Sequence, residues 1–273
     1  MRAMHYRGLK QAARRCLRDS HTPYRRLTLL FFLCFLGLSM LCDLISFYLE
    51  RRLEQETGFG TIALQNQADL FNVLSMVGLS VVGSLWNAGY SWFALRISRG
   101  QPASFGDFFQ GFRLVSRVLA VVVLQSILIA AWSMLFLLPG LVAMYRYRMA
   151  VFAVLDDPDL GPLQALSYSS RLTYGHKMEL LMLDLRFFWY YGTLFLVQLA
   201  VMAYNYGFLP VGAYTDRGYW TVYILYQGVM LLVETLALAY VTATQAHAFN
   251  WLQTLDRDRM EDLRRSYGGG YPM

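Results

Sequence analysis

Residues 118–138 read VLAVVVLQSILIAAWSMLFLL, and Pro139-Gly140 follows directly. Only Gln125, Ser126 and Ser133 are polar in this run. An α-helix rises about 1.5 Å per residue, so a helix of this length crosses a hydrocarbon core of about 30 Å. The stretch therefore predicts a transmembrane helix, which the Pro-Gly pair then ends.

The rest of the chain has the same apolar character. It contains 273 residues, of which 56% are hydrophobic and 15% charged, with a mean hydropathy of +0.35. Soluble domains carry about 25% charged residues, and disordered chains carry more charge and less apolar surface. Three cysteines without a C-x-x-C spacing do not predict a disulfide scaffold. The composition therefore excludes these three classes and favours a membrane protein.

Five further apolar stretches accompany the first, at 27–49, 70–95, 141–155, 180–204 and 221–250. The stretch at 27–49 is too long for the apolar core of a signal peptide, and no cleavage site follows it, so we interpret it as an uncleaved span. We expect an all-α, polytopic membrane helical bundle of about six membrane elements. Its membrane domain covers 27–250, between a basic segment at 1–26 and a tail at 251–273.

The segments outside the spans suggest short helices at the membrane surface. Eight Lys and Arg residues lie within 1–26, with Leu9, Ala13 and Leu17 among them at helical spacing. This pattern fits an amphipathic helix on anionic lipid headgroups, or else a solvated basic arm. A second short interfacial helix is expected near 160–175, ending at Gly175. The tail at 251–273 is charged and then Gly-rich, which predicts mobility.

The distribution of basic residues predicts the topology. With six elements and both termini in the cytosol, eighteen of the 24 Lys and Arg residues face the cytosol and three face outward. If 118–155 were one bent crossing, the division would be thirteen against eight. The positive-inside rule favours the first arrangement. A re-entrant hairpin over 118–155 would give the same sidedness as two full spans, so both remain open.

Ionisable residues within the apolar stretches are the candidate functional residues, because burying a charge in hydrocarbon costs about 2.5–3.5 kcal/mol. They are Arg146, Arg148, Asp184, Arg186 and Glu234. We hypothesise that Arg146 pairs with Glu234, and that Asp184 pairs with Arg148 or Arg186. The alternative is that these side chains reach the headgroups, or hold the bundle together, without transporting anything.

Motifs for catalysis and cofactor binding are missing from the sequence, including H-E-x-x-H, G-x-S-x-G and the glycine-rich phosphate loops. The four histidines show no metal-ligand spacing. We therefore predict no catalytic, cofactor-binding or metal-binding residues.

A series of short motifs resembles the bacterial integral-membrane family catalogued as domain of unknown function 975. The similarity covers roughly residues 5–250 and rests on the order of these residues: Leu9-Lys10, Ala13-Arg14, Phe108, Gly111-Phe112, Leu138-Pro139-Gly140, Tyr145, Asp157-Pro158, Ala165-Leu166, Ser169, Gly175 and Lys177. The family usually has Leu-Ser-Phe and then Gly-Trp in the fifth span. This chain has Leu185-Arg186-Phe187-Phe188-Trp189, so that helix is expected to pack differently. The resemblance implies architecture and location but no reaction.

Together these observations predict a non-enzymatic protein of the bacterial plasma membrane, acting in envelope organisation or as an accessory membrane subunit. The alternative is a small-solute or lipid permease that uses the intramembrane polar groups. The expected partners are the lipid bilayer, anionic headgroups at the basic N-terminus and another membrane protein. Nucleic acid is not expected, because the net charge of +6 fits the membrane surface.

Overall fold

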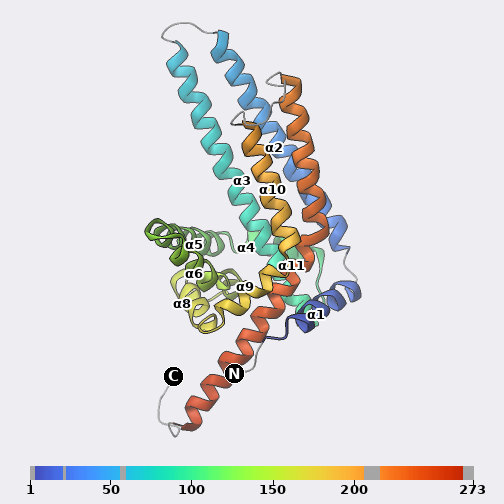
Figure 1. The fold of residues 1–273 in the computed structure, drawn as a ribbon, viewed down its shortest axis with the longest axis vertical. Coiled ribbons are helices and arrows are strands. Elements are labelled where there is room, and N and C mark those ends of the chain that lie inside the picture. Colours follow the sequence, from blue (N-terminus) through green and yellow to red (C-terminus); the bar gives the residue numbers. More distant parts are fainter. Residues whose placement is uncertain (1–3, 21–22, 56–59, 206–215, 267–273) are drawn as a thin grey trace. The chain divides into compact units, whose positions relative to one another are not determined.

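The computed structural model of the chain describes residues 4–20, 23–55, 60–205 and 216–266, and every regular element in these ranges is a helix. Figure 1 shows their course. In chain order they are α1 (Tyr6–Asp19), α2 (Tyr24–Gln55), α3 (Gly60–Ser98), the 3₁₀ helix η1 (Phe105–Phe109), α4 (Gln110–Arg113), α5 (Val115–Leu135), α6 (Leu137–Tyr147), α7 (Ala150–Asp156), α8 (Pro162–Leu172), α9 (Lys177–Leu185), α10 (Phe188–Asn205) and α11 (Asp216–Ser266). The predicted all-α class is confirmed.

Five helical segments among the described residues are long and apolar enough to cross a membrane. They are Tyr24–Leu53, Thr61–Ser98, Val115–Leu135, Leu137–Asp156 and Thr221–Ser266. A sixth arises if α9 and α10, which meet at a bend of 73°, form one broken span. The chain is therefore a multi-pass membrane protein, and the expected number of about six membrane elements agrees with the structure.

The chain folds into two compact units. Unit 1 comprises Met1–Thr22, Leu85–Phe188 and Ala239–Met273, and unit 2 comprises Pro23–Ser84 and Trp189–Leu238. Both α3 and α11 contribute residues to both units. The membrane domain expected over 27–250 stays a prediction, because the two units are defined by packing and not by the membrane. Helix α11 continues past residue 250 through the charged stretch to Ser266. The Gly-rich segment 267–273 lies outside the described residues.

Helices α5 and α6 form an antiparallel hairpin in unit 1 and lie side by side (Figure 1). The break between them is at Phe136, which is extended at φ −160° and ψ 154°, and not at Pro139-Gly140 as the sequence suggests. Pro139 instead lies in the first turn of α6, where its missing N–H has no helical partner to lose. Gly140 allows the close approach of α5, because a Cβ there would lie 2.1 Å from the Ser133 Oγ.

The tip of this hairpin consists of five large apolar residues that no other part of unit 1 covers. Their exposed fractions range from 61% to 88% over Met134, Leu135, Phe136, Leu137 and Leu138. Such a cluster is unfavourable in water and favourable in lipid.

Apolar clusters hold the helices of unit 1 together. One joins α5, α6, α7 and α8 through residues such as Val121, Ala150 and Leu166. Another includes Met4, Phe249 and Leu252, with Leu9 of α1 packed against it. Both Ala13 and Leu17 of α1 are also buried. The apolar face of α1 is therefore used inside the protein, and not against lipid as an interfacial helix would require.

An aromatic cluster fixes the end of α3 in unit 1. The Phe108 ring of η1 stacks on Phe93 with centroids 4.4 Å apart, and it also contacts Trp86 and Tyr90 at 5.6 and 5.2 Å. Gly89 permits this packing, because a Cβ there would lie 1.8 Å from the Phe108 carbonyl oxygen. The glycine is thus required by the close approach of η1 to the α3 backbone.

In unit 2, polar side chains connect α2 with α3 and α11. The Tyr223 hydroxyl of α11 donates to Asp43 of α2 at 2.5 Å, and Gln227 donates to Tyr223 at 2.9 Å. Ser46 of α2 donates to Asn72 of α3 at 2.5 Å. Asp43 and Ser46 of α2 thus each have a partner on another helix, and Gln227 supports Tyr223 from one turn further along α11.

Candidate functional site

The interruption between α6 and α7 is the first element of the site, because it leaves backbone groups without helical partners. The hydroxyl of Ser169 on α8 hydrogen-bonds two of these backbone groups. Its Oγ accepts a hydrogen bond from the Met149 N–H at 3.1 Å and donates to the Arg146 carbonyl at 2.9 Å. Thr173, one turn later, also donates to the Arg146 carbonyl at 3.2 Å. Both Ser169 and Thr173 are fully buried. Buried backbone groups need such partners, so α8 is fixed against the break.

The broken segment brings Arg148 to Asp184 of α9. The two side chains form a two-pronged ion pair, with Nη2 and Oδ1 2.7 Å apart. Tyr145 donates its hydroxyl proton to the Asp184 Oδ2 at 2.9 Å, and the Arg148 guanidinium lies 5.4 Å from the centre of the Tyr145 ring. The side chains of Arg148 and Asp184 are only 18% and 12% exposed. Of the two partners proposed for Asp184, the structure gives it Arg148.

Arg186 has a different environment, next to α1. Its guanidinium lies 4.6 Å from the centre of the Tyr6 ring, and its carbonyl accepts a hydrogen bond from the Lys10 ammonium at 3.2 Å. Burial, followed by the charges of Arg14 and Arg186, lowers the pKa of Lys10. Arg186 therefore helps to hold α1 and does not join Asp184, which lies two residues earlier on another face of the chain.

The hypothesis of an Arg146–Glu234 ion pair has no support among the described contacts. Arg146 belongs to unit 1, where its Nε donates to the Ser170 Oγ at 2.7 Å. Glu234 belongs to unit 2, where it accepts a hydrogen bond from the Tyr190 hydroxyl at 2.9 Å. The pair was expected because, in a single helical bundle, two side chains at a similar depth in the membrane can lie close together. Because the chain forms two units, each residue has its partner within its own unit.

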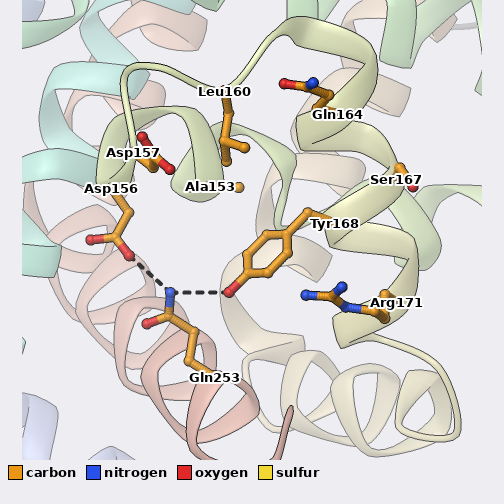
Figure 2. Close-up of a pocket in the computed structure, with 9 residues that line it drawn as sticks. All are labelled: Ala153, Asp156, Asp157, Leu160, Gln164, Ser167, Tyr168, Arg171 and Gln253. Carbon is orange, nitrogen blue, oxygen red and sulfur yellow. Dashed lines mark hydrogen bonds between the residues drawn. The ribbon is translucent and has the colours of Figure 1, made fainter. Parts of the chain in front are cut away.

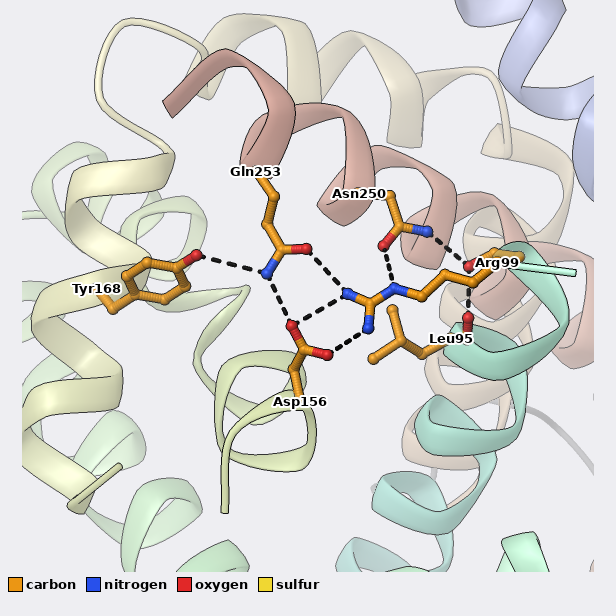
Figure 3. A network of polar contacts seen from close by, with 7 residues as sticks. Leu95, Arg99, Asp156, Tyr168, Asn250 and Gln253 are labelled. Atoms are coloured by element: carbon orange, nitrogen blue, oxygen red, sulfur yellow. Dashed lines mark hydrogen bonds and ion pairs between the residues drawn. The ribbon is translucent and has the colours of Figure 1, made fainter. Parts of the chain in front are cut away.

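A polar network in unit 1 was not anticipated from the sequence (Figure 3). Arg99, just beyond α3, forms a two-pronged ion pair with Asp156 at the end of α7, with Nη2 and Oδ2 3.0 Å apart. Arg99 also donates to Asn250 at 3.0 Å and to Gln253 at 2.9 Å, both on α11. Gln253 in turn donates to Asp156 at 2.8 Å. Gln253 also donates to the Tyr168 hydroxyl of α8 at 3.4 Å, so the network joins Arg99 with residues of α7, α8 and α11.

No sequence signal identified these residues, for a physical reason. Arg99 and Asp156 are 57 positions apart, and Arg99 and Gln253 are 154 apart. Arg99 follows an apolar stretch and Asp156 follows another, so in the sequence each resembles an ordinary charged residue that flanks a span. Only the tertiary packing brings the three side chains together.

A pocket of about 610 Å³ opens beside this network (Figure 2). It is lined by the following residues of α7, α8, α11 and the α7–α8 connection: Ala153, Asp156, Asp157, Leu160, Gln164, Ser167, Tyr168, Arg171 and Gln253. Figure 2 shows the two aspartates on one side, Gln164, Ser167 and Arg171 on the other, and the Tyr168 ring between them. The pocket thus combines carboxylate, guanidinium, amide and hydroxyl groups in one concave surface.

The described residues contain no group of three or more His, Cys, Asp or Glu side chains that could hold a metal ion. His176 contacts Glu179 at 3.1 Å and Trp251 at a centroid distance of 5.2 Å.

Comparison of the chain with protein-family models, with curated proteins and with solved structures finds no match. The fold and the buried ion pairs define the class to which the chain belongs, that of multi-pass helical membrane proteins.

Proposed function

We propose that this chain is a non-enzymatic protein of a bacterial plasma membrane, with both termini in the cytosol. In this proposal it organises the envelope or serves as an accessory subunit of another membrane protein. The observation that most supports this non-enzymatic role is that three arginine side chains of unit 1 form ion pairs with aspartates. These pairs are Arg96–Asp107, Arg99–Asp156 and Arg148–Asp184.

Each of these pairs has additional partners that hold it in place. Asp107 also accepts a hydrogen bond from the Ser104 backbone N–H at 2.6 Å, and Asp184 accepts one from Tyr145. Fully satisfied polar networks make a structure rigid. The rigid interior fits a protein that presents a surface to a neighbour.

Photo-crosslinking in native membranes tests this role. We expect crosslinks to a second, different polypeptide from probes placed on the exposed apolar faces of α2 and α10, and co-purification of that polypeptide in mild detergent. Probes at the buried positions Val154 and Ala165 serve as controls and should give none. Recovery of the chain alone at monomer mass, without crosslinks from any position, would contradict an accessory role.

A permease is the second candidate, because unit 2 contains a part-polar pocket between α2 and α11. Its volume is about 240 Å³, and Glu234, Gln227 and Ser39 line it together with apolar side chains. If this pocket carries a substrate, Glu234→Gln should abolish uptake of a small cation or amine into proteoliposomes. Glu50→Gln, on the exposed surface of α2, should leave that uptake unchanged. Absence of any flux for the unmodified protein would exclude this alternative for the solutes assayed.

A further inference from the structure

The pocket of unit 1 has an acidic side and a basic side. Asp157, in the connection after α7, faces the pocket from one side, and Arg171, in the last turn of α8, faces it from the other (Figure 2). The Tyr168 ring and the apolar side chains of Ala153 and Leu160 lie between them. A ligand that fits this arrangement carries a positive and a negative group separated by a short, partly apolar linker.

One charged side chain at the pocket, that of Asp157, has no ion-pair partner among the described residues, whereas the others do. The negative charge of Asp156 is matched by Arg99, and the positive charge of Arg171 by Asp256, whose Oδ2 is 3.1 Å from Nη2. Asp157 accepts a hydrogen bond from the Asp159 backbone N–H at 3.1 Å and forms no ion pair among the described residues. Its carboxylate is therefore available to a cation.

The basic side also retains binding capacity. The side chain of Arg171 is 54% exposed and uses Nη2 for Asp256, and a guanidinium has five N–H donors. The hydroxyl of Ser167 and the amide group of Gln164 lie on the same side. Guanidinium and hydroxyl donors in this combination are typical of phosphate recognition.

We propose that this pocket binds a zwitterion of the phosphoethanolamine class. Its primary ammonium binds Asp157, and its phosphate binds Arg171 and Ser167. The volume of about 610 Å³ accommodates the headgroup together with a glycerol moiety. This site is independent of the proposed accessory role, and nothing in that role requires it.

Two sources could supply the same chemistry, namely a free phosphoethanolamine ester or the headgroup of a membrane phospholipid. Leu163, in the first turn of α8, and Tyr174, two residues after its end, are each 70% exposed and would contact acyl chains if the pocket lies at the membrane surface. The experiment therefore includes one arm with the soluble compound and one with the lipid.

The test uses the full chain in nanodiscs of phosphatidylcholine, with glycerophosphoethanolamine as the probe and isothermal titration calorimetry as the measurement. We expect saturable binding, and no binding of glycerophosphocholine, whose quaternary ammonium cannot donate a hydrogen bond to Asp157. Asp157→Asn and Arg171→Gln should each weaken binding about tenfold or more, the loss of one charge-assisted hydrogen bond. Glu261→Gln and Arg257→Gln, which alter exposed residues outside the pocket, are the matched controls and should bind normally.

The lipid arm repeats the titration in nanodiscs that contain phosphatidylethanolamine. Loss of probe binding there identifies the membrane lipid as the natural ligand, and unchanged binding identifies a soluble ester. Thermal unfolding of each variant without ligand shows whether the fold is intact, which matters for Arg171→Gln because it also loses Asp256. Equal affinity of the unmodified protein and the folded Asp157→Asn variant would overturn the proposal. So would the absence of probe binding in phosphatidylcholine nanodiscs.

Discussion

Substitution of Gly89 by alanine should destabilise the protein strongly, although the same change elsewhere on α3 should not. The new Cβ would lie 1.8 Å from the carbonyl oxygen and 2.6 Å from the carbonyl carbon of Phe108. Since real Cβ contacts essentially never fall below 3.0 Å, η1 would have to move away by about 1.2 Å or more. Both Phe108 atoms belong to the backbone, so no side-chain rotation relieves their overlap with the new Cβ.

The cost follows from what this displacement disrupts. The Phe108 ring would lose its fit against Phe93, Tyr90 and Trp86, and each aromatic pair contributes about 0.5–1.5 kcal/mol beyond its buried area. We therefore expect a loss of about 2–4 kcal/mol. For a chain of this size that corresponds to a decrease in Tm of about 4–16 °C.

The matched control is Gly78→Ala on the same helix. A Cβ at Gly78 meets nothing within 4 Å, and alanine has a higher helix propensity than glycine by about 0.8–1 kcal/mol. This variant should be as stable as the unmodified protein or more so.

Thermal unfolding in mild detergent, followed by near-ultraviolet circular dichroism, measures both variants, because this signal reports on the packing of aromatic side chains. If Gly89→Ala and Gly78→Ala unfold at the same temperature, the close contact between α3 and η1 does not exist and the reasoning is refuted.

Three further substitutions test the other features of unit 1. Asp184→Ala leaves Arg148 without its partner and should cost about 3–5 kcal/mol in the same unfolding assay; strictly additive effects in a double-mutant cycle with Arg148→Met would speak against the ion pair. Ser169→Ala removes the hydroxyl at the α6–α7 break and should cost about 1–3 kcal/mol, with faster hydrogen exchange at the Met149 amide; an unchanged exchange rate would show that the hydroxyl does not protect this amide. Leu137→Cys, in a background without the three native cysteines, should resist a membrane-impermeant maleimide from both sides of sealed vesicles, because the apolar hairpin tip stays in lipid; labelling from the outer side would instead indicate two full spans.

Local sequence signals were sufficient to predict the helices. Apolar runs long enough to cross a bilayer identify α2, α3, α5 and α11, because the requirement for internal backbone hydrogen bonds in lipid leaves few alternatives to a helix. The same signals were less informative about helix ends. The helical conformation is interrupted at Phe136, although phenylalanine is not a helix breaker. Pro139 is a helix breaker, but it lies in the first turn of α6. The turn at Phe136 accompanies the tertiary contact of α5 with α6 at Gly140, which local sequence signals do not report.

The candidate site was predictable only in part. The cost of a charge in hydrocarbon pointed to Arg148 and Asp184, and the structure joins them. The same argument paired Arg146 with Glu234, which belong to separate units. The Arg99–Asp156 network lies at helix ends, where charged side chains are common and inexpensive. Because its residues come from distant parts of the sequence, only the three-dimensional structure shows that they contact one another.

The one-residue connection between α5 and α6 has a consequence for biogenesis. A single extended residue spans only about 3.5 Å, so the C-terminal end of α5 and the N-terminal end of α6 stay next to each other once both have left the ribosome. We therefore expect the insertion machinery to release the two helices to the bilayer together. An epitope or glycosylation acceptor inserted at Phe136 would interrupt this step of synthesis before it could report on topology.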